Sequence, residues 1–392
     1  MLTGRQGGEA AGLEAQSALL PVYAQFPVRP ARGEGSWIID VEGHRWLDAY
    51  GGHAVASTGH CHPHVVRAIA EQASQLIFYS TVLPHPNREL LASRIAALMP
   101  EGLDRSFFCN SGAEANENAL GLARKRTGRE LVVSVTGGWH GRTVATLAVT
   151  DGAKYEAGAR RAGMPLSQKV PFNDVAALDR AIDDSVAALI VEPVQGMSGA
   201  RDCSHPFLQA ARAACTRHGV ALIFDEIQCG VGRLGAFSAA GFYGVTPDAI
   251  TMAKGLASGF PIAAVTVGDF LAEGVTIGDL GSTFGGGPLA CAAALATLDV
   301  IGQEDLTGNA ARVGQQLRDG ALSLGVPSVQ GHGLLLGLRL GRPAQPVQQA
   351  LFERRILTGT ASDPEVLRLL PPLSLSRDEA GLLLAGLAEV LA

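Results

Sequence analysis

The stretch LIFDEIQCGVGRLG, Leu222–Gly235, runs from an apolar segment into two adjacent carboxylates and then into a glycine cluster. The apolar part has the length and composition of a buried strand. In sheets of parallel strands, ligands bind beyond the carboxyl ends of the strands. Charge at such a strand end, at Asp225 and Glu226, is therefore typical of a ligand site in an α/β protein. Successive strand residues point to opposite faces, so only one of the two carboxylates can face the ligand.

Short apolar runs, most of them leading into glycine or charge, recur along the middle of the chain, with helix-like segments between several of them. They are RSFFCNSG (105–112), ELVVSVTGG (130–138), VAALIVEPVQG (186–196), GVALIFDEIQ (219–228), DAITMAKG (248–255) and PIAAVTVG (261–268). Strands that are apolar throughout and alternate with helices predict a mostly parallel sheet with helices on both faces. We therefore expect an α/β fold.

The two ends of the chain have a different pattern. PLACAAALATLDVIG (288–302) predicts a long helix, GHGLLLGLRLG (331–341) a strand, and RDEAGLLLAGLAEVLA (377–392) an amphipathic closing helix. Near the start, GSWIIDVEGHRWLDA (35–49) has the pattern of a hairpin that could join them. These features predict a smaller α+β domain built from both ends of the chain.

From these patterns we expect a large domain over residues 55–300, a small domain over residues 301–392, and an N-terminal segment, residues 1–54, that joins the small domain. The length of 392 residues and the 47% hydrophobic content suit such a protein.

Composition excludes several classes of protein. The formal net charge of −6 argues against a nucleic-acid binder, which usually carries a basic stripe. The six cysteines form no CxxC pair and are typical of reduced thiols in the cytosol. The opening residues contain no apolar core of signal-peptide length, and no run reaches the roughly 18 apolar residues of a membrane span. We expect a cytoplasmic protein that binds neither nucleic acid nor membrane.

Two motifs suggest sites that their context does not support. GVGRLG (230–235) matches a dinucleotide fingerprint, but DEIQC separates it from the strand and no crossover helix follows. We interpret it as a loop beside the site. GHCHPH (59–64) resembles alternating metal ligands, but Pro63 interrupts the strand and no carboxylate or cysteine pair accompanies it, so structural histidines are favoured over a metal site. No G-x-S-x-G elbow is present for a hydrolase triad.

Lys254 follows an apolar run and stands among alanine and glycine. Partial desolvation lowers the pKa of such a lysine and makes its amine nucleophilic. An isolated lysine of this kind is usually a surface residue, but Asp225 and Glu192 also end apolar runs. The three side chains would meet at one edge of the predicted sheet.

Ser111, Gly112 and Ala113 open a predicted helix, whose N–H groups and dipole suit a phosphate. Ser111 with Glu114 also matches a capping box, which is compatible with phosphate binding. A nucleophilic lysine, a buried acid and a phosphate site together suit pyridoxal 5′-phosphate, because its aldehyde needs an amine and its pyridine nitrogen needs a carboxylate.

Several motifs together resemble one family. SGAEANENA (111–119), GGWHGRT (137–143), VEPVQG (191–196), LIFDEIQCGVGR (222–233), MAKGL (252–256) and GSTFGGGPLACAAALA (281–296), in this order, are similar to the class III (subgroup II) aminotransferases. RGEG and TGHCHP, within residues 32–63, and VLRLLPPL (366–373) extend the resemblance over nearly the whole chain. The motifs are most like those of the acetylornithine enzymes, with acyl-lysine and ornithine enzymes related to them. The resemblance implies fold type I of the pyridoxal-phosphate enzymes and a homodimer with shared active sites.

The resemblance also implies roles for single residues. Lys254, which binds the cofactor aldehyde, and Asp225, which pairs with the pyridine nitrogen, are the expected catalytic residues. The expected cofactor-binding set is Ser111, Gly112, Ala113, Trp139, Glu192, Asp225, Gln228, Lys254, Ser282 and Thr283. Gln228 would touch the ring hydroxyl and Trp139 would stack on the ring. Ser282 and Thr283 would reach the phosphate of the neighbouring subunit.

Substrate carboxylates would be held by Tyr23 and Arg142, with Arg368 as a second carboxylate-binding arginine. The family pattern E-P-[IV]-Q-G-E-[GA]-G reads EPVQGMSG here, so Met197 replaces a glutamate that pairs in relatives with the arginine matching Arg368. Gly287 likewise replaces a common asparagine. The first departure concerns the substrate rather than the cofactor.

The resemblance implies a transaminase that moves an amino group between an acylated ornithine, or a similar ω-amine, and 2-oxoglutarate, a reaction of arginine biosynthesis. Ornithine, acyl-lysine or 4-aminobutyrate-like substrates are alternatives. A pyridoxal-phosphate aminomutase or racemase would use the same lysine and acid without exchanging an oxo acid. A nicotinamide dehydrogenase would need the fingerprint excluded above, and a non-catalytic scaffold would not need both Lys254 and Asp225.

Overall fold

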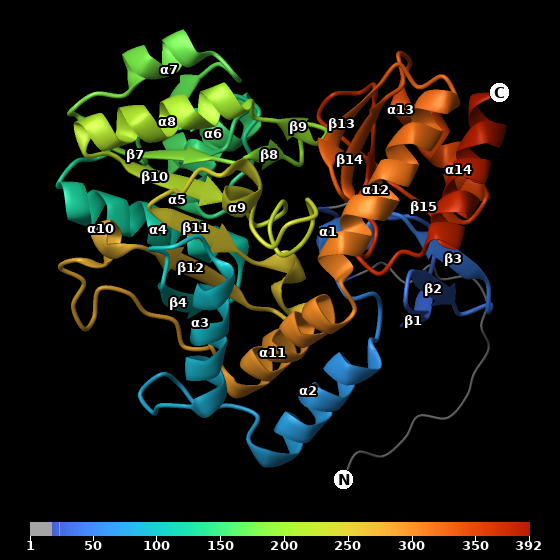
Figure 1. Ribbon diagram of the computed structural model, residues 1–392, viewed down its shortest axis with the longest axis horizontal. Helices are drawn as coiled ribbons and strands as arrows, with labels where there is room; N and C mark the ends of the chain where they lie inside the picture. Colours follow the sequence, from blue (N-terminus) through green and yellow to red (C-terminus); the bar gives the residue numbers. More distant parts are fainter. Residues whose placement is uncertain (1–17, 23) are drawn as a thin grey trace.

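The computed structural model describes residues 18–22 and 24–392. Within these residues, the larger part of the molecule is built on a sheet of seven strands in the order β4-β12-β11-β10-β7-β5-β6 (Figure 1). The strands are β4 (Arg105–Cys109), β5 (Leu131–Val135), β6 (Gln168–Val170), β7 (Val186–Val191), β10 (Ala221–Asp225), β11 (Ala249–Met252) and β12 (Ala263–Val267). β12 runs antiparallel to both of its neighbours, and the pairs among the other strands are parallel. The mostly parallel sheet expected from the sequence is confirmed.

Helices cover both faces of this sheet because its strands are apolar on both sides. On β10, Phe224 belongs to one hydrophobic cluster together with Phe207 of α8 (His205–His218). The preceding residue, Ile223, belongs to another cluster together with Leu120 of α4 (Gly112–Thr127). Adjacent strand residues thus pack under helices on opposite faces, as the alternation of a strand requires.

The two carboxylates at the end of β10 continue this alternation. Asp225 lies on the α4 face, where Asn116 donates to it. Glu226 lies on the opposite face and accepts the first two N–H groups of α9 (Ala239–Tyr243) at 2.7 and 2.8 Å. Burial raises the pKa of the Glu226 carboxyl to about 7, against the effect of these two hydrogen bonds. Glu226 therefore anchors the start of α9 and has a structural role.

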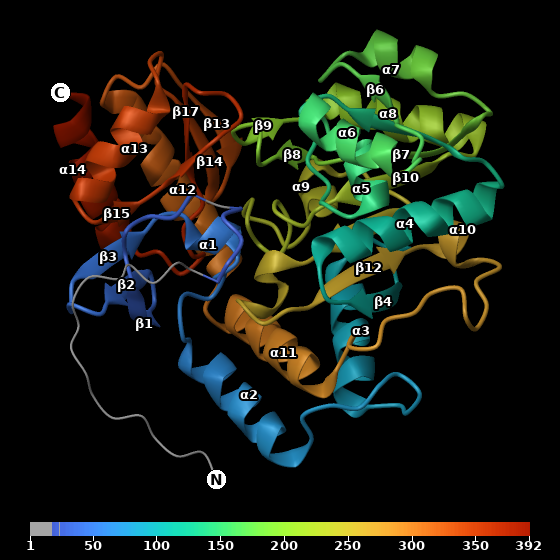
Figure 2. The ribbon, with the colours of Figure 1, turned by 180° about the vertical axis from the view of Figure 1, so that it is seen from behind.

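The remaining helices of this part are short or lie around the edge of the sheet (Figures 1 and 2). They are α2 (Pro63–Gln75), α3 (Pro86–Leu98), α5 (Val144–Val149), α6 (Ala153–Arg161), α7 (Val175–Ala181), α10 (Asp269–Ala272), the 3₁₀ helix η1 (Lys254–Ala257) and α11 (Pro288–Gln303). The predicted alanine-rich helix is α11, which packs on α2, α3 and η1. A two-stranded sheet, β8 (Val194–Gln195) with β9 (Arg201–Asp202), follows β7.

The two ends of the chain lie side by side in both views, in blue and in orange to red (Figures 1 and 2). One four-stranded sheet of the described residues joins β1 (Pro30–Glu34), β2 (Trp37–Asp40) and β3 (Arg45–Asp48) to β15 (Ile356–Leu357). A second joins β13 (Ser328–His332), β14 (Leu335–Arg339), β17 (Val366–Leu369) and β16 (Gly359–Thr360). The helices α12 (Leu306–Ser323), α13 (Ala344–Glu353) and α14 (Arg377–Leu391) pack here. We propose the two-domain division at residues 54 and 300 on this basis.

One expected strand differs from the structure. Residues 331–341 contain the end of β13, a turn and β14, which pair as an antiparallel hairpin instead of forming one strand. Gly333 has a φ of +53° and lies between the two strands, so the chain reverses there. The apolar residues around this turn hid it in the sequence, because Leu334, Leu335 and Leu336 are all fully or almost fully buried.

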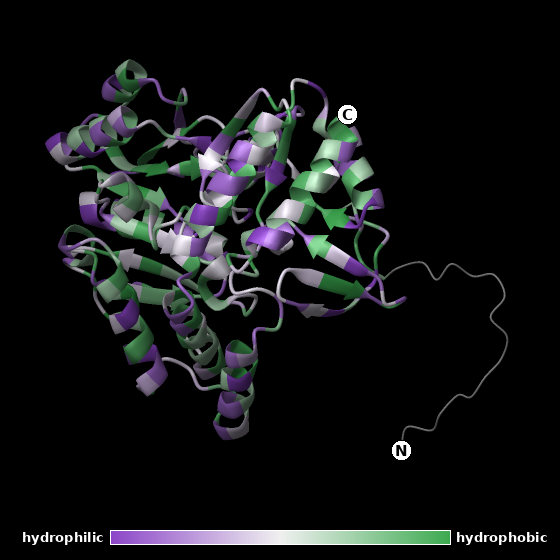
Figure 3. Cartoon of the chain, turned by 45° about the vertical axis from the view of Figure 1, so that its right-hand side comes forward, coloured by the Kyte–Doolittle hydropathy of each residue, from purple (hydrophilic) through white to green (hydrophobic). Residues whose placement is uncertain are grey.

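Hydrophobic residues concentrate on the central strands, and hydrophilic residues are frequent on the outer helices (Figure 3). None of the helices in the described residues is both long and apolar enough to span a membrane. The histidines of the GHCHPH motif point to different carboxylates: His60 to Asp48 at 2.7 Å and His62 to Glu304 at 2.9 Å. His62 also caps α2, so these side chains have structural roles.

Candidate active site

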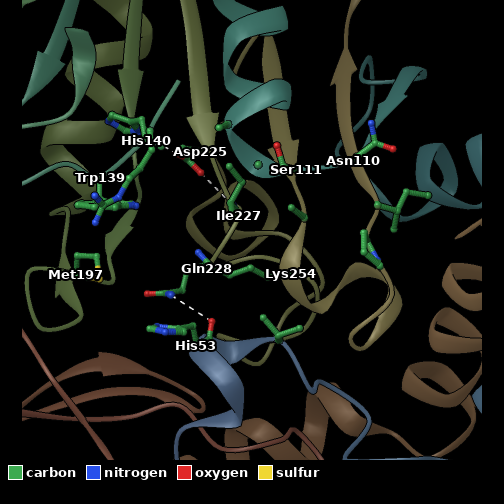
Figure 4. Close-up of a pocket in the computed structure, with 18 of the residues that line it drawn as sticks. His53, Asn110, Ser111, Trp139, His140, Met197, Asp225, Ile227, Gln228 and Lys254 are labelled. Carbon is green, nitrogen blue, oxygen red and sulfur yellow. Dashed lines mark hydrogen bonds and ion pairs between the residues drawn. The ribbon is translucent and has the colours of Figure 1, made fainter. Parts of the chain in front are cut away.

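A cavity of about 500 Å³ opens beyond the carboxyl ends of the parallel strands. Most of the predicted site residues line it, namely Ser111, Gly112, Ala113, Trp139, Arg142, Glu192, Asp225, Gln228 and Lys254. Ser111 lies at one end, Trp139 and Met197 lie at the other, and Gln228 and Lys254 lie between them (Figure 4). The cavity thus has one end at the start of α4 and another at Trp139 and Met197.

Asp225 is held by three hydrogen-bond donors of the protein. Its Oδ2 accepts from Asn116 Nδ2 and from His140 Nδ1, both at 2.8 Å, and its Oδ1 accepts from the Ile227 N–H at 3.1 Å. A carboxylate has about four acceptor positions, so roughly one remains for a donor in the cavity. Carboxylate oxygens accept hydrogen bonds, so the Nδ1 of His140 is the donor in its contact with Oδ2.

Asn116 fixes the orientation of this carboxylate. Its Oδ1 accepts from the hydroxyl of Thr251 at 2.7 Å, and its Nδ2 also donates to the carbonyl of His140 at 2.8 Å. Thr251 lies directly beside Asp225 in the register of β11 and β10. The side-chain amide can therefore present only its N–H group to Asp225. This small network joins α4, β10, β11 and the loop after β5.

Glu192 is the second buried carboxyl of the site and has a different environment. It accepts from the Trp139 N–H at 2.7 Å and from the Gly196 N–H at 3.3 Å. Burial, and then the nearby Asp225 charge, raise the pKa of Glu192 to about 7. Through these two hydrogen bonds, Glu192 holds the backbone at Trp139 and at Gly196.

Lys254 follows β11 and points into the middle of the cavity (Figure 4). Its φ of +43° is unusual for a residue with a side chain, and such strain is frequent at functional sites. Burial lowers the pKa of the Lys254 amine, while Asp225 and Glu192 oppose this shift. A lysine with a lowered pKa is available as a nucleophile and as a base.

The end of the cavity at α4 suits a phosphate. Ser111 caps the helix, and Glu114 completes the capping box by accepting the Ser111 N–H at 2.7 Å. The first N–H groups of a helix have no intrahelical acceptor, which leaves those of Gly112 and Ala113 for an anion. A side chain at position 112 would lie 2.6 Å from a methyl group of Ile227, so glycine is required for the close packing of this loop.

Gln228 gives a direct test of whether pyridoxal phosphate fits. Its Oε1 is buried and has no hydrogen-bond partner within the described residues, although its Nε2 donates to the carbonyl of His53 at 3.4 Å. A buried acceptor without a donor is costly unless a ligand supplies one. The ring hydroxyl of the cofactor, the phosphate at α4 and the amine of Lys254 are compatible with one molecule in this cavity.

Two aromatic rings, those of Trp139 and Tyr155, line the cavity beside Arg142. The guanidinium of Arg142 lies 5.1 Å from the ring centroid of Trp139 and 5.4 Å from that of Tyr155. The two rings meet edge to face at 4.8 Å. A cation held over aromatic rings keeps its charge while its N–H groups stay available to a carboxylate. This position in the cavity lining is compatible with the predicted role of Arg142 in binding a substrate carboxylate.

Arg368 lies behind the wall of the cavity rather than in it. It is 2% exposed and donates to the carbonyls of Thr360 at 2.6 Å and Gly196 at 3.2 Å, and to the Tyr50 hydroxyl at 3.2 Å. No carboxylate lies within ion-pair distance of it among the described residues. Burial lowers the pKa of this guanidinium, and Tyr50 and Glu192 oppose the shift.

Ser282 and Thr283 lie outside the cavity lining. Ser282 accepts from Asn110 Nδ2 of the same chain at 3.1 Å, and Thr283 is exposed on the surface. Tyr23 lies outside the described residues. The sequence analysis missed Asn116, although an asparagine among the buried residues of a helix is a signal that could have found it.

His140 and the Tyr50–His53 pair were also missed. His140 sits in the GGWHGRT motif, directly after a predicted site residue, but nothing in the sequence indicated its contact with Asp225. Tyr50 and His53 come from the N-terminal segment, which was expected in the other domain. A contact between segments that are far apart in the chain produces no local pattern in the amino-acid sequence.

Comparisons with known proteins agree with this arrangement. The family model described as aminotransferase class-III matches residues 21–391. The acetylornithine aminotransferase of Methanocaldococcus jannaschii is 40% identical over 382 residues, which is 95% of each chain. The ornithine aminotransferase of Toxoplasma gondii has a TM-score of 0.89 at 31% identity, covering 95% of this chain and 92% of that one. An amine transaminase from an uncultivated Pseudomonas species, solved with pyridoxal phosphate bound, has a TM-score of 0.86 at 30% identity, covering 98% and 99%.

Proposed function

This chain belongs to the class-III aminotransferases, and on that basis we propose that it moves an amino group between an acylated ornithine and 2-oxoglutarate. The observation that carries the substrate proposal is the similarity to an acetylornithine aminotransferase over 95% of both chains. The enzyme is a pyridoxal-phosphate-dependent transaminase. A cavity that brings Lys254, Asp225 and the start of α4 together supports this chemistry.

Bound pyridoxal phosphate supplies an aldehyde that condenses with amines and a protonated ring that withdraws electrons from the substrate carbon. Asp225 would hold the proton on the ring nitrogen with its remaining acceptor position. Gln228 would accept the ring hydroxyl, and Gly112 and Ala113 would donate to the phosphate. Lys254, whose pKa is lowered by burial, would remove the proton from the amine-bearing carbon of the substrate.

We also propose that the enzyme is a homodimer in the cytoplasm. Large apolar side chains are exposed on α3 and in the segments around it, among them Ile77 (64%), Val82 (76%) and Phe284 (63%). The rings of Phe78 and Phe284 lie 5.0 Å apart between centroids, tilted by 49°, and their contact joins two of these segments into one apolar surface. A second copy of the chain is the proposed occupant of this surface, and the exposed Thr283 beside it would then reach the partner's phosphate site.

The proposed activity predicts a defined substrate ranking. With 2-oxoglutarate as acceptor, N-acetylornithine should give glutamate with a higher kcat/KM than ornithine, an acyl-lysine or 4-aminobutyrate. Lys254→Ala should lower kcat by on the order of 10²- to 10⁴-fold, because the proton transfer loses its base. The exposed Lys154 gives the control, Lys154→Ala, which should behave as wild type. Product formation without any oxo-acid exchange would instead indicate an aminomutase or racemase.

The dimer proposal predicts a link between assembly and cofactor binding. Sedimentation should give the mass of two chains, and Phe284→Asp should shift it toward one chain while weakening pyridoxal-phosphate binding. Thr283→Ala should weaken cofactor binding without changing the mass. An active species with the mass of one chain contradicts the proposal.

Met197 predicts that dicarboxylic substrates, such as glutamate, gain in kcat/KM relative to ω-amines that carry one carboxylate. A thioether cannot neutralise the Arg368 charge, and the Gly196 carbonyl next to Met197 already contacts this guanidinium. Met197→Glu should mask the charge and shift the ratio of kcat/KM values roughly 10-fold toward amines with one carboxylate. Met197→Gln, with the same length and no charge, is the matched control. If both variants give the same ratio, the charge at this position does not set the preference.

A further inference from the structure

The turn after β3 has an unusual backbone. Gly51, Gly52, His53 and Ala54 of α1 (Gly51–Ala54) have φ values of +57°, +56°, +69° and +64°, which is one turn of left-handed helix. This conformation is disfavoured for His53 and Ala54, because Cβ approaches the following carbonyl oxygen. Strain of this kind persists only where the surrounding structure holds it.

Contacts on both sides hold the turn and direct it to the cavity. Asp48 Oδ1 accepts the N–H groups of Tyr50 at 3.0 Å and Gly51 at 2.8 Å. A side chain at Gly51 would lie 2.6 Å from the carbonyl oxygen of Leu370, so the turn is packed tightly against β17 and the loop after it. On the cavity side, Gln228 donates to the His53 carbonyl (Figure 4). The turn therefore delivers the His53 side chain to the cavity, at the end opposite Ser111.

The hydrogen bond between His53 and Tyr50 indicates which imidazole nitrogen carries the proton. His53 Nδ1 lies 2.6 Å from the Tyr50 hydroxyl oxygen, which accepts from Arg368 at 3.2 Å. Arginine only donates, so the hydroxyl can direct its own proton to Nδ1. In a neutral imidazole with Nδ1 as acceptor, Nε2 carries the proton. The Nε2–H group is then the donor that His53 offers to a ligand.

The charges that face His53 are mostly positive. Burial, then Arg368 of β17 and Lys254 of η1, lower the pKa of the His53 imidazole. Tyr50 is neutral, since burial raises the pKa of its hydroxyl. Met197, on the same side of the cavity, has no charge (Figure 4). The carboxyl groups of Asp48, before the turn, and Glu192, in the cavity lining, both accept hydrogen bonds from protein donors.

From this geometry we propose that His53 is a specificity-determining residue that donates its Nε2–H to the distal carboxylate of a dicarboxylic substrate. Tyr50 fixes the donor, and Arg368 supplies the positive charge behind it. The inference rests on the proposed transaminase function and assigns the dicarboxylate end of its substrate to this side of the cavity. A bound carboxylate offsets the two cations, so His53 takes up a proton from solvent when the anion binds.

The test measures binding of glutarate, a dicarboxylate with no amine or oxo group, to the holoenzyme. Titration calorimetry at pH 7.5 in buffers of different ionisation enthalpy gives the protons taken up per ligand. Wild-type enzyme should take up part of a proton with glutarate and should bind butyrate, with one carboxylate, much more weakly. An uptake of zero overturns the proposed titration of His53.

Two variants of His53 distinguish the effect of its hydrogen bond to the ligand from the effect of its proton uptake. Asparagine tolerates the left-handed conformation but is too short to reach the ligand, so His53→Asn should weaken glutarate binding roughly 10- to 100-fold, as expected for a lost hydrogen bond to a charged group. His53→Gln keeps an N–H donor that cannot titrate, so it should retain most of the affinity and lose the proton uptake. Tyr50→Phe should reduce the affinity by an intermediate factor.

Controls are needed for both measured quantities, the glutarate affinity and the proton uptake. His332→Gln changes a half-exposed histidine that pairs with Asp202, away from the cavity, and should leave both quantities unchanged. The melting temperature and the cofactor absorbance of each variant establish that it is folded and loaded. Full affinity and full proton uptake in His53→Asn would overturn the proposal. The amine panel tests the transaminase function separately, because glutarate binding needs no turnover.

Discussion

The hydrogen bonds to Asp225 are the interaction on which the rest of this active site depends. Asn116, His140 and the Ile227 N–H together hold one carboxylate at the end of β10 and leave one acceptor position facing the cavity. Each donor comes from a different segment, and Asn116 is fixed in turn by Thr251. The large sheet and α4 must therefore be assembled before Asp225 has its final geometry. The cofactor chemistry relies on this assembly.

Burial acts differently on the ionisable groups of the cavity because their partners differ. Glu192 receives two backbone N–H groups beside the Asp225 charge, and its pKa rises to about 7. Lys254 is buried away from solvent, which lowers the pKa of its amine. Arg368 donates hydrogen bonds only to neutral groups, so no carboxylate of the described residues pairs with its charge. The Tyr50 hydroxyl connects this guanidinium to His53, which lines the cavity. The groups proposed for the chemistry lie in the centre of the cavity, and His53, proposed to bind a carboxylate, lies at the end opposite Ser111.

The sequence predicted the parts of the molecule that depend on local patterns. Apolar strands that end in Asp225, Glu192 and Lys254 indicated both the parallel sheet and the cofactor cluster, because parallel strands bring their carboxyl ends together. Contacts between distant segments were not predictable. The left-handed turn that carries His53, the position of Arg368 behind Tyr50, and the hairpin at Gly333 all depend on packing between elements far apart in the chain.

The most direct test of the account is the turnover of Asp225→Asn. This change keeps the shape of the side chain and removes the charge that holds the pyridine proton. We expect the variant to bind pyridoxal phosphate and to transaminate at least about 10²-fold more slowly, a loss of about 2.7 kcal/mol in transition-state stabilisation. Near-normal turnover with bound cofactor would show that the carboxylate at the end of β10 is not the group on which the chemistry depends.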